Sequence, residues 1–258
     1  MSQSVAMHMS DGLINAPTSV IFGGVAVVGM AAAMVGARRD LDDRTAPMAG
    51  LVAAFVFATQ MLNFPILPGV SGHLLGGALA AMLVGPWVGA LCVGIVLVVQ
   101  ALVFADGGLT ALGANITNMA LIGTAAGYLV ALALRPIALR GRSGLFATAF
   151  VAAFCNTVIA SLGFVLEFAI GGDAAFSLAG VTGTMVGLHT LIGIGEGVIT
   201  ALTVTAVAAV RPDLVHLLRG TAKPLERREG AAAGLTEERA RERGTSVEPA
   251  TTEGGGRE

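Results

Sequence analysis

The chain has 258 residues, of which 55% are hydrophobic and 12% are charged, and its formal net charge is -2. Soluble domains contain about 25% charged residues, so this composition leaves too little polar surface to coat a globule in water. It places most of the chain in lipid. The long stretches without lysine or arginine also exclude a basic nucleic-acid-binding surface.

Seven apolar runs follow one another along the chain. A bilayer core of about 30 Å requires about 20 apolar residues in a helix. The runs are Pro17–Ala37, Ala46–Phe64, Leu74–Pro86, Val88–Ala105, Asn115–Leu134, Leu145–Ile170 and Thr184–Val210. The third run is too short to cross unaided, and the sequence leaves open whether it is tilted, broken or continued by Gly69–His73. Because lipid offers the backbone no hydrogen-bond partner, we predict an all-α polytopic membrane protein with about seven transmembrane helices.

Basic residues form three clusters, which begin at Arg38, Arg135 and Arg211. The positive-inside rule assigns such clusters to the cytoplasm. Four apolar runs separate the first two clusters and two runs separate the last two, so the parity is consistent with seven spans. We therefore expect a multi-pass protein of the cell (inner) membrane, with its N-terminus outside and its C-terminus cytoplasmic.

The composition changes after the last apolar run, so we expect the transmembrane domain to end at residue 219. Residues 220–258 are rich in Glu, Arg, Gly, Thr and Ala and have no periodic apolar stripe. We predict that they form a charged, disordered cytoplasmic tail.

His8 lies in the segment Met7–Gly12, just before the first run. Imidazole binds borderline divalent metals such as nickel, cobalt, copper and zinc. A histidine second from a free amino terminus offers more, because the terminal amine, the second amide and the imidazole can chelate one ion in a plane. Taken alone, His8 is also compatible with a solvated histidine in a loose terminus.

His73 lies in a glycine-rich segment that follows Pro65 and Pro68. The two prolines prevent a regular helix from running through this segment. Irregular backbone at a membrane boundary is tolerated where it lines a cavity. The alternative is a histidine whose ring lies at the membrane interface. The charge distribution predicts His8 and His73 on the same, outer face.

A glycine-rich loop, Asp106–Ala114, separates the fourth and fifth runs. Asn115 at the start of the following helix predicts an N-cap. Asn118, three residues later, would share its helix face. The sequence leaves open whether this loop only caps and packs or forms a wall of a metal pocket; no Walker-type motif follows it.

The last run contains two ionisable residues, His189 and Glu196, seven positions apart. Ionisable groups inside a membrane are costly and usually face the bundle interior. Their spacing is compatible with a hydrogen-bonded structural pair or with a functional role. We interpret Glu167, near the end of the sixth run, as a loop charge, and His216 as a solvated residue.

Together these motifs resemble the CbiM/NikM family, the substrate-binding membrane (S) components of cobalt and nickel energy-coupling-factor ABC importers. Residues 7–13, MHMSDGL, are similar to the family's amino-terminal Met-His-x-x-(Asp/Glu)-Gly-Phe/Leu signature. Further similar motifs follow in the family's order at Ser71–Leu74, Gly85–Pro86, Gln100–Leu102, Gly107–Asn115, Asn118–Met119 and His189–Thr200. The resemblance covers roughly Met7 to Arg211.

The resemblance implies a seven-helix fold with the metal held near the outside. The implied ligands are the amine of Met7, the backbone amide and imidazole of His8, and the imidazole of His73. The residues expected to lie around them are Asp11, Asn115, Asn118 and His189. The family's motif begins at the chain terminus, whereas six residues precede Met7 here. We therefore expect translation to start at Met7, or the extension of residues 1–6 to be removed, so that residues 7–219 form the transmembrane metal-binding domain.

The implied function is capture of Co²⁺ (or Ni²⁺) as transported substrate, with no catalytic residues and no permanently bound cofactor. The ion would supply cobalamin synthesis. The implied partners are a coupling transmembrane subunit, two cytosolic ATPase subunits and a small accessory membrane subunit, with no nucleic acid. Alternatives are a nickel-specific S component, an intramembrane metalloenzyme that uses His189 and Glu196, and a passive channel or scaffold.

Overall fold

The computed structural model describes residues 8–43, 45–61, 63–67, 70–172 and 175–220. The predicted extension 1–6, Met7 and nearly all of the predicted tail lie outside the described residues. The described elements, in chain order, are α1 (Ala16–Ala37), α2 (Thr45–Gln60), β1 (Asn63–Leu67), β2 (Val70–His73), α3 (Gly77–Val84), α4 (Pro86–Val103), α5 (Leu112–Asn115), η1 (Ile116–Gly123), α6 (Thr124–Ala133), α7 (Arg135–Ala138), α8 (Arg142–Gly171), α9 (Leu178–Val210), η2 (Pro212–Leu214) and η3 (His216–Leu218).

The described part of the chain is mostly helical, and five of its helical segments are long and apolar enough to cross a membrane. These are α1, α4, the continuous segment α5–η1–α6, α8 and α9. The apolar helix α2 is shorter, at 16 residues. The prediction of a polytopic helical protein is confirmed at this level, and the count of seven crossings stays a prediction.

The third apolar run forms α3, an eight-residue helix in which every residue is buried. At 1.5 Å per residue it is about 12 Å long, too short to span a bilayer. It packs against α2, α4, α6, α8 and α9. The residues before it form strand β2, so no helix continues it toward Gly69. A sharp turn at Gly85, with φ +93°, ends α3, and Pro86 begins α4.

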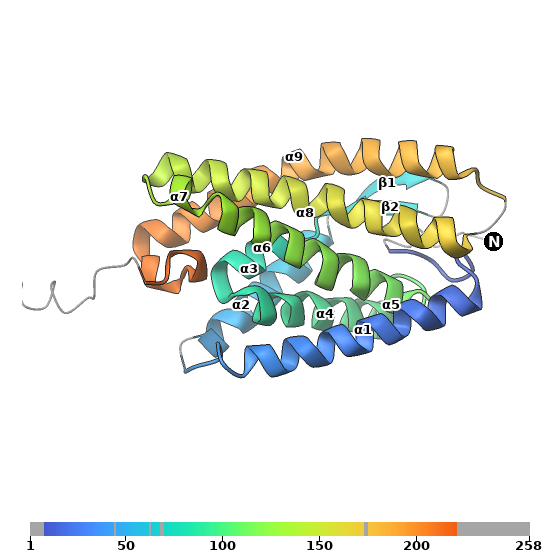
Figure 1. Ribbon diagram of the computed structural model, residues 1–258, viewed down its shortest axis with the longest axis horizontal. Helices are drawn as coiled ribbons and strands as arrows, with labels where there is room; N and C mark the ends of the chain where they lie inside the picture. Colours follow the sequence, from blue (N-terminus) through green and yellow to red (C-terminus); the bar gives the residue numbers. More distant parts are fainter. Residues whose placement is uncertain (1–7, 44, 62, 68–69, 173–174, 221–258) are drawn as a thin grey trace, which may run out of the picture. The chain divides into compact units, whose positions relative to one another are not determined.

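Strands β1 and β2 form a short antiparallel hairpin between α2 and α3 (Figure 1). Asn63 pairs with His73, and the register shifts between Pro65 and Leu67. Proline has no N–H to donate, which suits it to such an irregularity. The sequence predicted non-helical backbone here but not the hairpin, whose pairing fixes the end of β2 and therefore the position of His73.

Small residues bring the helices close together, as is common in membrane bundles. A Cβ atom on Gly127 of α6 would lie 2.7 Å from the Cβ of Ala78 in α3. A Cβ on Gly113 of α5 would lie 2.4 Å from the Cα of Gly23 in α1. Neither position therefore tolerates a side chain without displacement of a neighbouring helix. Helices α8 and α9 pack along much of their length (Figure 1).

The segment after α9 folds back onto the bundle. The guanidinium of Arg135 donates to the backbone oxygens of Leu217 and Arg219, both at 2.9 Å. His216 is partly buried, with its ring centroid 6.0 Å from that of Tyr128. The interpretation of His216 as a solvated residue is therefore wrong: η3 packs against α3, and this packing covers the imidazole.

Candidate metal site

A cavity of about 50 Å³ lies among the segment before α1, the β2–α3 junction, η1, α8 and α9. We call it the histidine cavity, because three of the four histidines of the chain line it: His8, His73 and His189. A water molecule needs about 10–15 Å³ of such space, so the cavity has room for one metal ion and a few waters. The other hydrogen-bonding side chains in its wall are Asn115, Asn118 and Ser161.

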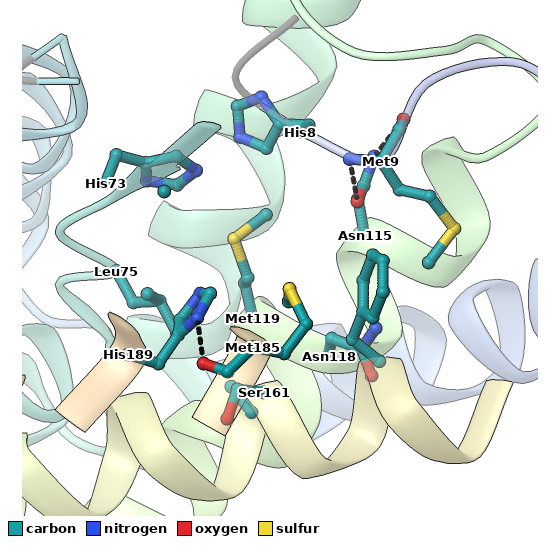
Figure 2. A pocket seen from close by; sticks show the side chains of 13 residues that line it. His8, Met9, His73, Leu75, Asn115, Asn118, Met119, Ser161, Met185 and His189 are labelled. Atoms are coloured by element: carbon teal, nitrogen blue, oxygen red, sulfur yellow. Dashed lines mark hydrogen bonds between the residues drawn. The ribbon is translucent and has the colours of Figure 1, made fainter. Parts of the chain in front are cut away.

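His8 and His73 meet in this cavity. Their ring centroids are 4.5 Å apart and their planes are inclined by 53°. Figure 2 shows the two rings side by side, one from the segment before α1 and the other from the end of β2. Their side chains are 5% and 4% exposed. Two adjacent imidazoles present the nitrogen donors that nickel, cobalt, copper and zinc accept.

The hydrogen bonding of His73 leaves one ring nitrogen for a ligand. Nδ1 lies 2.8 Å from the backbone oxygen of Leu74, which fixes the proton on Nδ1 as the donor and leaves the lone pair on Nε2. With its proton on Nδ1 and a lone pair on Nε2, the ring is in the neutral form that a metal ligand requires.

Glu196 of α9 anchors the junction that carries His73. Its carboxyl group accepts hydrogen bonds from the backbone N–H of Leu75 at 2.8 Å and of Gly76 at 2.9 Å. It also accepts from Asn156 Nδ2 at 3.0 Å and Thr157 Oγ1 at 2.7 Å. The residue before α3 is Gly76, which has no side chain to cap the helix. Glu196 therefore binds, from another helix, the N–H of the N-cap residue, as the glutamate of a capping box does from within its own helix.

The same junction depends on the backbone conformation of Gly76. Its φ is +78°, and a Cβ there would lie 2.8 Å from Val56 Cγ2. The side-chain amide of Gln60 donates to the backbone oxygen of Leu75 at 2.8 Å. Contacts from α2 and α9 thus hold the two residues that follow His73, which limits how far its ring can move.

Asn115 holds the chain next to His8. Its Oδ1 accepts from Met9 N at 3.1 Å, and its Nδ2 donates to Met9 O at 3.3 Å. Gly108 N also donates to Met9 O, at 2.9 Å. The prediction that Asn115 caps a helix is wrong: its side chain pairs with the backbone of a segment more than 100 residues away in sequence. This pairing places His8 at the cavity.

Asp106 contacts His8 from the loop after α4, and the sequence did not single it out. Its Oδ1 lies 3.3 Å from His8 Nδ1, in a geometry that is not a hydrogen bond. Both side chains are buried. The preceding residue, Ala105, has φ +52°, an uncommon value for a residue with a side chain, and such values cluster at functional sites. In the sequence, the signal for Asp106 was its position as a single acidic residue between an apolar run and two glycines.

The comparisons with known proteins point to metal transport. Residues 8–214 match the CbiM family model, described as the cobalt uptake substrate-specific transmembrane region. The chain is 30% identical over 220 residues to the cobalt transport protein CbiM of Sorangium cellulosum, covering 83% of this chain and 96% of that one. It is 33% identical over 231 residues to the fused nickel transport protein NikMN of Rhodobacter capsulatus, covering 84% and 66%.

The chain belongs to the CbiM family. The crystal structure of a transition metal transporter matches it with a TM-score of 0.70 and 27% identity, covering 83% of this chain and 100% of that one. Family membership and the apolar helices identify a multi-pass membrane protein of cobalt and nickel transport.

Two further predicted residues of this CbiM-family chain lie in the cavity wall. His189 comes from α9 and does not bond Glu196; its Nδ1 lies 2.8 Å from the backbone oxygen of Met185. Asn118 comes from the π-helical segment η1 and donates to Glu167 Oε2 at 2.7 Å. The interpretation of Glu167 as a loop charge is wrong, since it lies within α8 and is 0% exposed.

The remaining predicted residues lie elsewhere. Asp11 is exposed and does not line the cavity; its Oδ1 accepts from Thr110 N at 2.8 Å and from the Thr110 hydroxyl. These bonds hold the pKa of Asp11 below its ordinary value of 3.8. Met7 lies outside the described residues. Among those described, no three His, Cys, Asp or Glu side chains group closely enough to hold a metal ion. The cavity thus brings two imidazoles together, and a metal site built on them would need further donors.

Proposed function

We propose that this chain is the substrate-specific subunit of an energy-coupling-factor ABC importer and captures Co²⁺ or Ni²⁺ at the outer face of the membrane. The observation that carries this proposal is the contact of His8 with His73 in a buried cavity. Buried polar groups without hydrogen bonds are rare in native proteins, and inside membranes they commonly mark functional sites. Within the described part of the chain, neither ring nitrogen of His8 has such a bond.

The proposed ligand set adds backbone donors to the two imidazoles. With a mature chain that begins at Met7, its amine, the deprotonated amide of His8 and a ring nitrogen of His8 chelate the ion. His73 then supplies the fourth nitrogen through Nε2. Such a planar nitrogen set disfavours Ca²⁺ and Mg²⁺, which prefer oxygen ligands. Asp106, beside His8, would offset part of the charge of the ion, and Asn115 and Asn118 would keep the ligands in place.

The start of the mature chain has its own test. We expect the intact mass of the protein purified from its native membrane to correspond to a chain that begins at Met7. A native mass that includes Met1 would remove the free amine from the ligand set.

The proposed topology places the histidine cavity near the outer surface. Seven crossings result if α2 counts as one and α3, together with the extended chain of β2, counts as another. The basic clusters then lie in the cytoplasm, with the N-terminus outside and the C-terminus inside. The transmembrane domain would span residues 7–219, and residues 220–258 would form a cytoplasmic tail.

The proposed subunit does no ATP chemistry of its own. The sequence contains no Walker-type glycine-lysine-serine/threonine motif. Two cytosolic ATPase subunits would hydrolyse ATP, a coupling transmembrane subunit would transmit the motion, and a small accessory membrane subunit would complete the complex. The imported ion would supply cobalamin synthesis.

Removal of either imidazole tests the function directly. We expect His8→Ala and His73→Ala to weaken Co²⁺ and Ni²⁺ binding by at least about 100-fold, since even loss of groups that only orient a ligand costs about 10–100-fold. Isothermal titration of the purified full-length protein measures this. His216→Ala is the matched control, because His216 does not line the cavity. Unchanged affinity in both cavity variants, with the fold intact, would refute the assignment.

The nature of the cargo needs a separate experiment, because amine and imidazole ligands suit cobalt and nickel alike. We expect Co²⁺ to be the preferred ion, in line with the description of the matching family. A competition titration that adds Co²⁺ to Ni²⁺-loaded protein decides between the two. Failure of Co²⁺ to displace Ni²⁺ would favour the nickel-specific alternative.

A further inference from the structure

We propose that the histidine cavity holds a second, softer binding site for a transition-metal ion, formed by the imidazole of His189 and the thioethers of Met119 and Met185. All three side chains line the cavity. In the view of Figure 2, His189 and Met185 lie below His8 and His73, and the side chain of Met119 lies between the two pairs. The proposal rests on the proposed function in one respect: the ion captured by the outer histidines is the one that this site would receive.

The hydrogen bonding of His189 is that of a metal ligand. Its Nδ1 lies 2.8 Å from the backbone oxygen of Met185, so Nδ1 donates its proton and Nε2 carries the lone pair. The hydrogen bonds of the described residues provide no partner for Nε2. A metal-bound histidine almost always donates its other ring N–H to a carboxylate, a carbonyl or water. His73 has the same arrangement, with its Nδ1 on Leu74 O.

Two thioether sulfurs belong to the same wall. Met119 is 8% exposed and Met185 is 4% exposed, so neither side chain lies against lipid. Thioethers are soft donors that suit soft transition-metal ions. The flexible side chain of methionine allows its sulfur to turn toward an ion. Met119 lies in η1, a π-helical stretch, and π-helical turns occur frequently at functional sites.

Core packing explains methionines that fill space, but it does not explain this part of the cavity wall. The cavity of about 50 Å³ remains between the side chains. The imidazole of His189, whose Nδ1 is already hydrogen-bonded, faces this cavity next to the two sulfurs. An apolar core that needed only volume would not place a polar ring there, because burial of a polar atom without a partner costs free energy.

The donor atoms of this inner site are neutral, and this determines which ions the site would bind and how tightly. Among the residues that the structure describes, no acidic side chain lines the cavity. A doubly charged ion without a compensating carboxylate is poorly stabilised in low-dielectric surroundings. The inner site would therefore hold Co²⁺ or Ni²⁺ weakly and only in passage, while a soft monovalent ion such as Cu⁺ would bind long enough to be observed.

X-ray absorption spectroscopy with Cu⁺ tests the site without the outer histidines. We use the full-length His8→Ala/His73→Ala variant in detergent and add one equivalent of Cu⁺. We expect sulfur scatterers together with one imidazole in the first coordination shell. The sulfur signal should disappear when Met119→Leu and Met185→Leu are added. It should persist with Met82→Leu, which changes a buried methionine of α3 outside the cavity. A sulfur signal that survives loss of Met119 and Met185 would overturn the proposal.

Uptake by the assembled importer separates this site from the outer one. We expect Met119→Leu/Met185→Leu to slow Ni²⁺ uptake by about tenfold, the size of effect that loss of a metal-supporting group produces. Ni²⁺ affinity at the outer histidines should remain within about twofold. Normal uptake by the Met119→Leu/Met185→Leu variant would refute the inner site without affecting the proposed function. Unchanged Ni²⁺ binding in His8→Ala and His73→Ala would instead refute the proposed function.

Discussion

Two polar clusters lie buried in this membrane bundle, and they differ in how completely their hydrogen bonds are made. The carboxyl group of Glu196 accepts four hydrogen bonds. In the histidine cavity, both ring nitrogens of His8 lack a hydrogen bond, and the hydrogen bonds of the described residues leave Nε2 of His73 and of His189 unused.

Such a difference is expected between a structural group and a binding site. A buried carboxyl group with four hydrogen bonds stiffens the fold, whereas buried nitrogens without hydrogen bonds are costly unless a ligand completes them. The two clusters are also linked, since Glu196 binds the backbone of Leu75 and Gly76, directly after His73. The filled cluster thus supports the unfilled one.

The largest expected effect is on folding, in Glu196→Gln. The amide group replaces one acceptor oxygen with a donor, and this donor would face groups that are themselves donors. With two of the four left unsatisfied at about 1–3 kcal/mol each, we expect a loss of roughly 4 kcal/mol in the free energy of unfolding. Thermal or denaturant unfolding in detergent measures the change.

Glu167→Gln is the matched control for this effect. Glu167 is also fully buried, but the structure describes one hydrogen bond to it, from Asn118. We therefore expect less than half of the destabilisation seen for Glu196→Gln. Equal losses in the two variants would show that the four hydrogen bonds of Glu196 are not the cause of the destabilisation.

A smaller effect, on binding alone, is expected for Asp106→Asn. The substitution keeps the side-chain volume and removes the carboxylate that lies 3.3 Å from His8 Nδ1. We expect Co²⁺ and Ni²⁺ affinity to fall about 10–100-fold, as for other groups that support a metal ligand. Titration measures the affinity, and the unfolding midpoint should stay near that of the unchanged protein. A variant that binds normally would show that Asp106 has no part in the site.

The sequence predicted the helices well because hydropathy over about twenty residues is a local property. It could not predict the hairpin of β1 and β2, because strand pairing depends on register. It predicted that the third run is too short to cross unaided but not which form the run takes, because an eight-residue helix such as α3 persists in a membrane only when other helices surround it. These two elements are the ones that position His73.

The sequence predicted which residues form the candidate site better than it predicted the contacts between them. His8, His73, Asn115, Asn118 and His189 were all expected at one pocket, and the structure places them around one cavity. Their roles in metal binding stay predictions. The partners of Asn115 and Asn118 were missed because each lies on a segment distant in sequence. Local rules assigned Asn115 to the nearest helix end, whereas the tertiary fold pairs it with Met9.

The smallest expected effect concerns Asp11, whose carboxylate bonds Thr110 on the rim rather than inside the cavity. Because its pKa is lowered from 3.8 in the folded protein, its contribution to stability is present above that pH and is lost as the pH falls through the lowered value. We expect Asp11→Asn to cost less than about 1 kcal/mol, since solvent screens such exposed interactions. Unfolding midpoints of both proteins, measured at neutral pH and again below the lowered pKa of Asp11, should differ only at neutral pH. Metal affinity should stay within about threefold, since Asp11 touches neither imidazole. A loss of metal affinity as large as that expected for Asp106→Asn would show that Asp11 is part of the binding site.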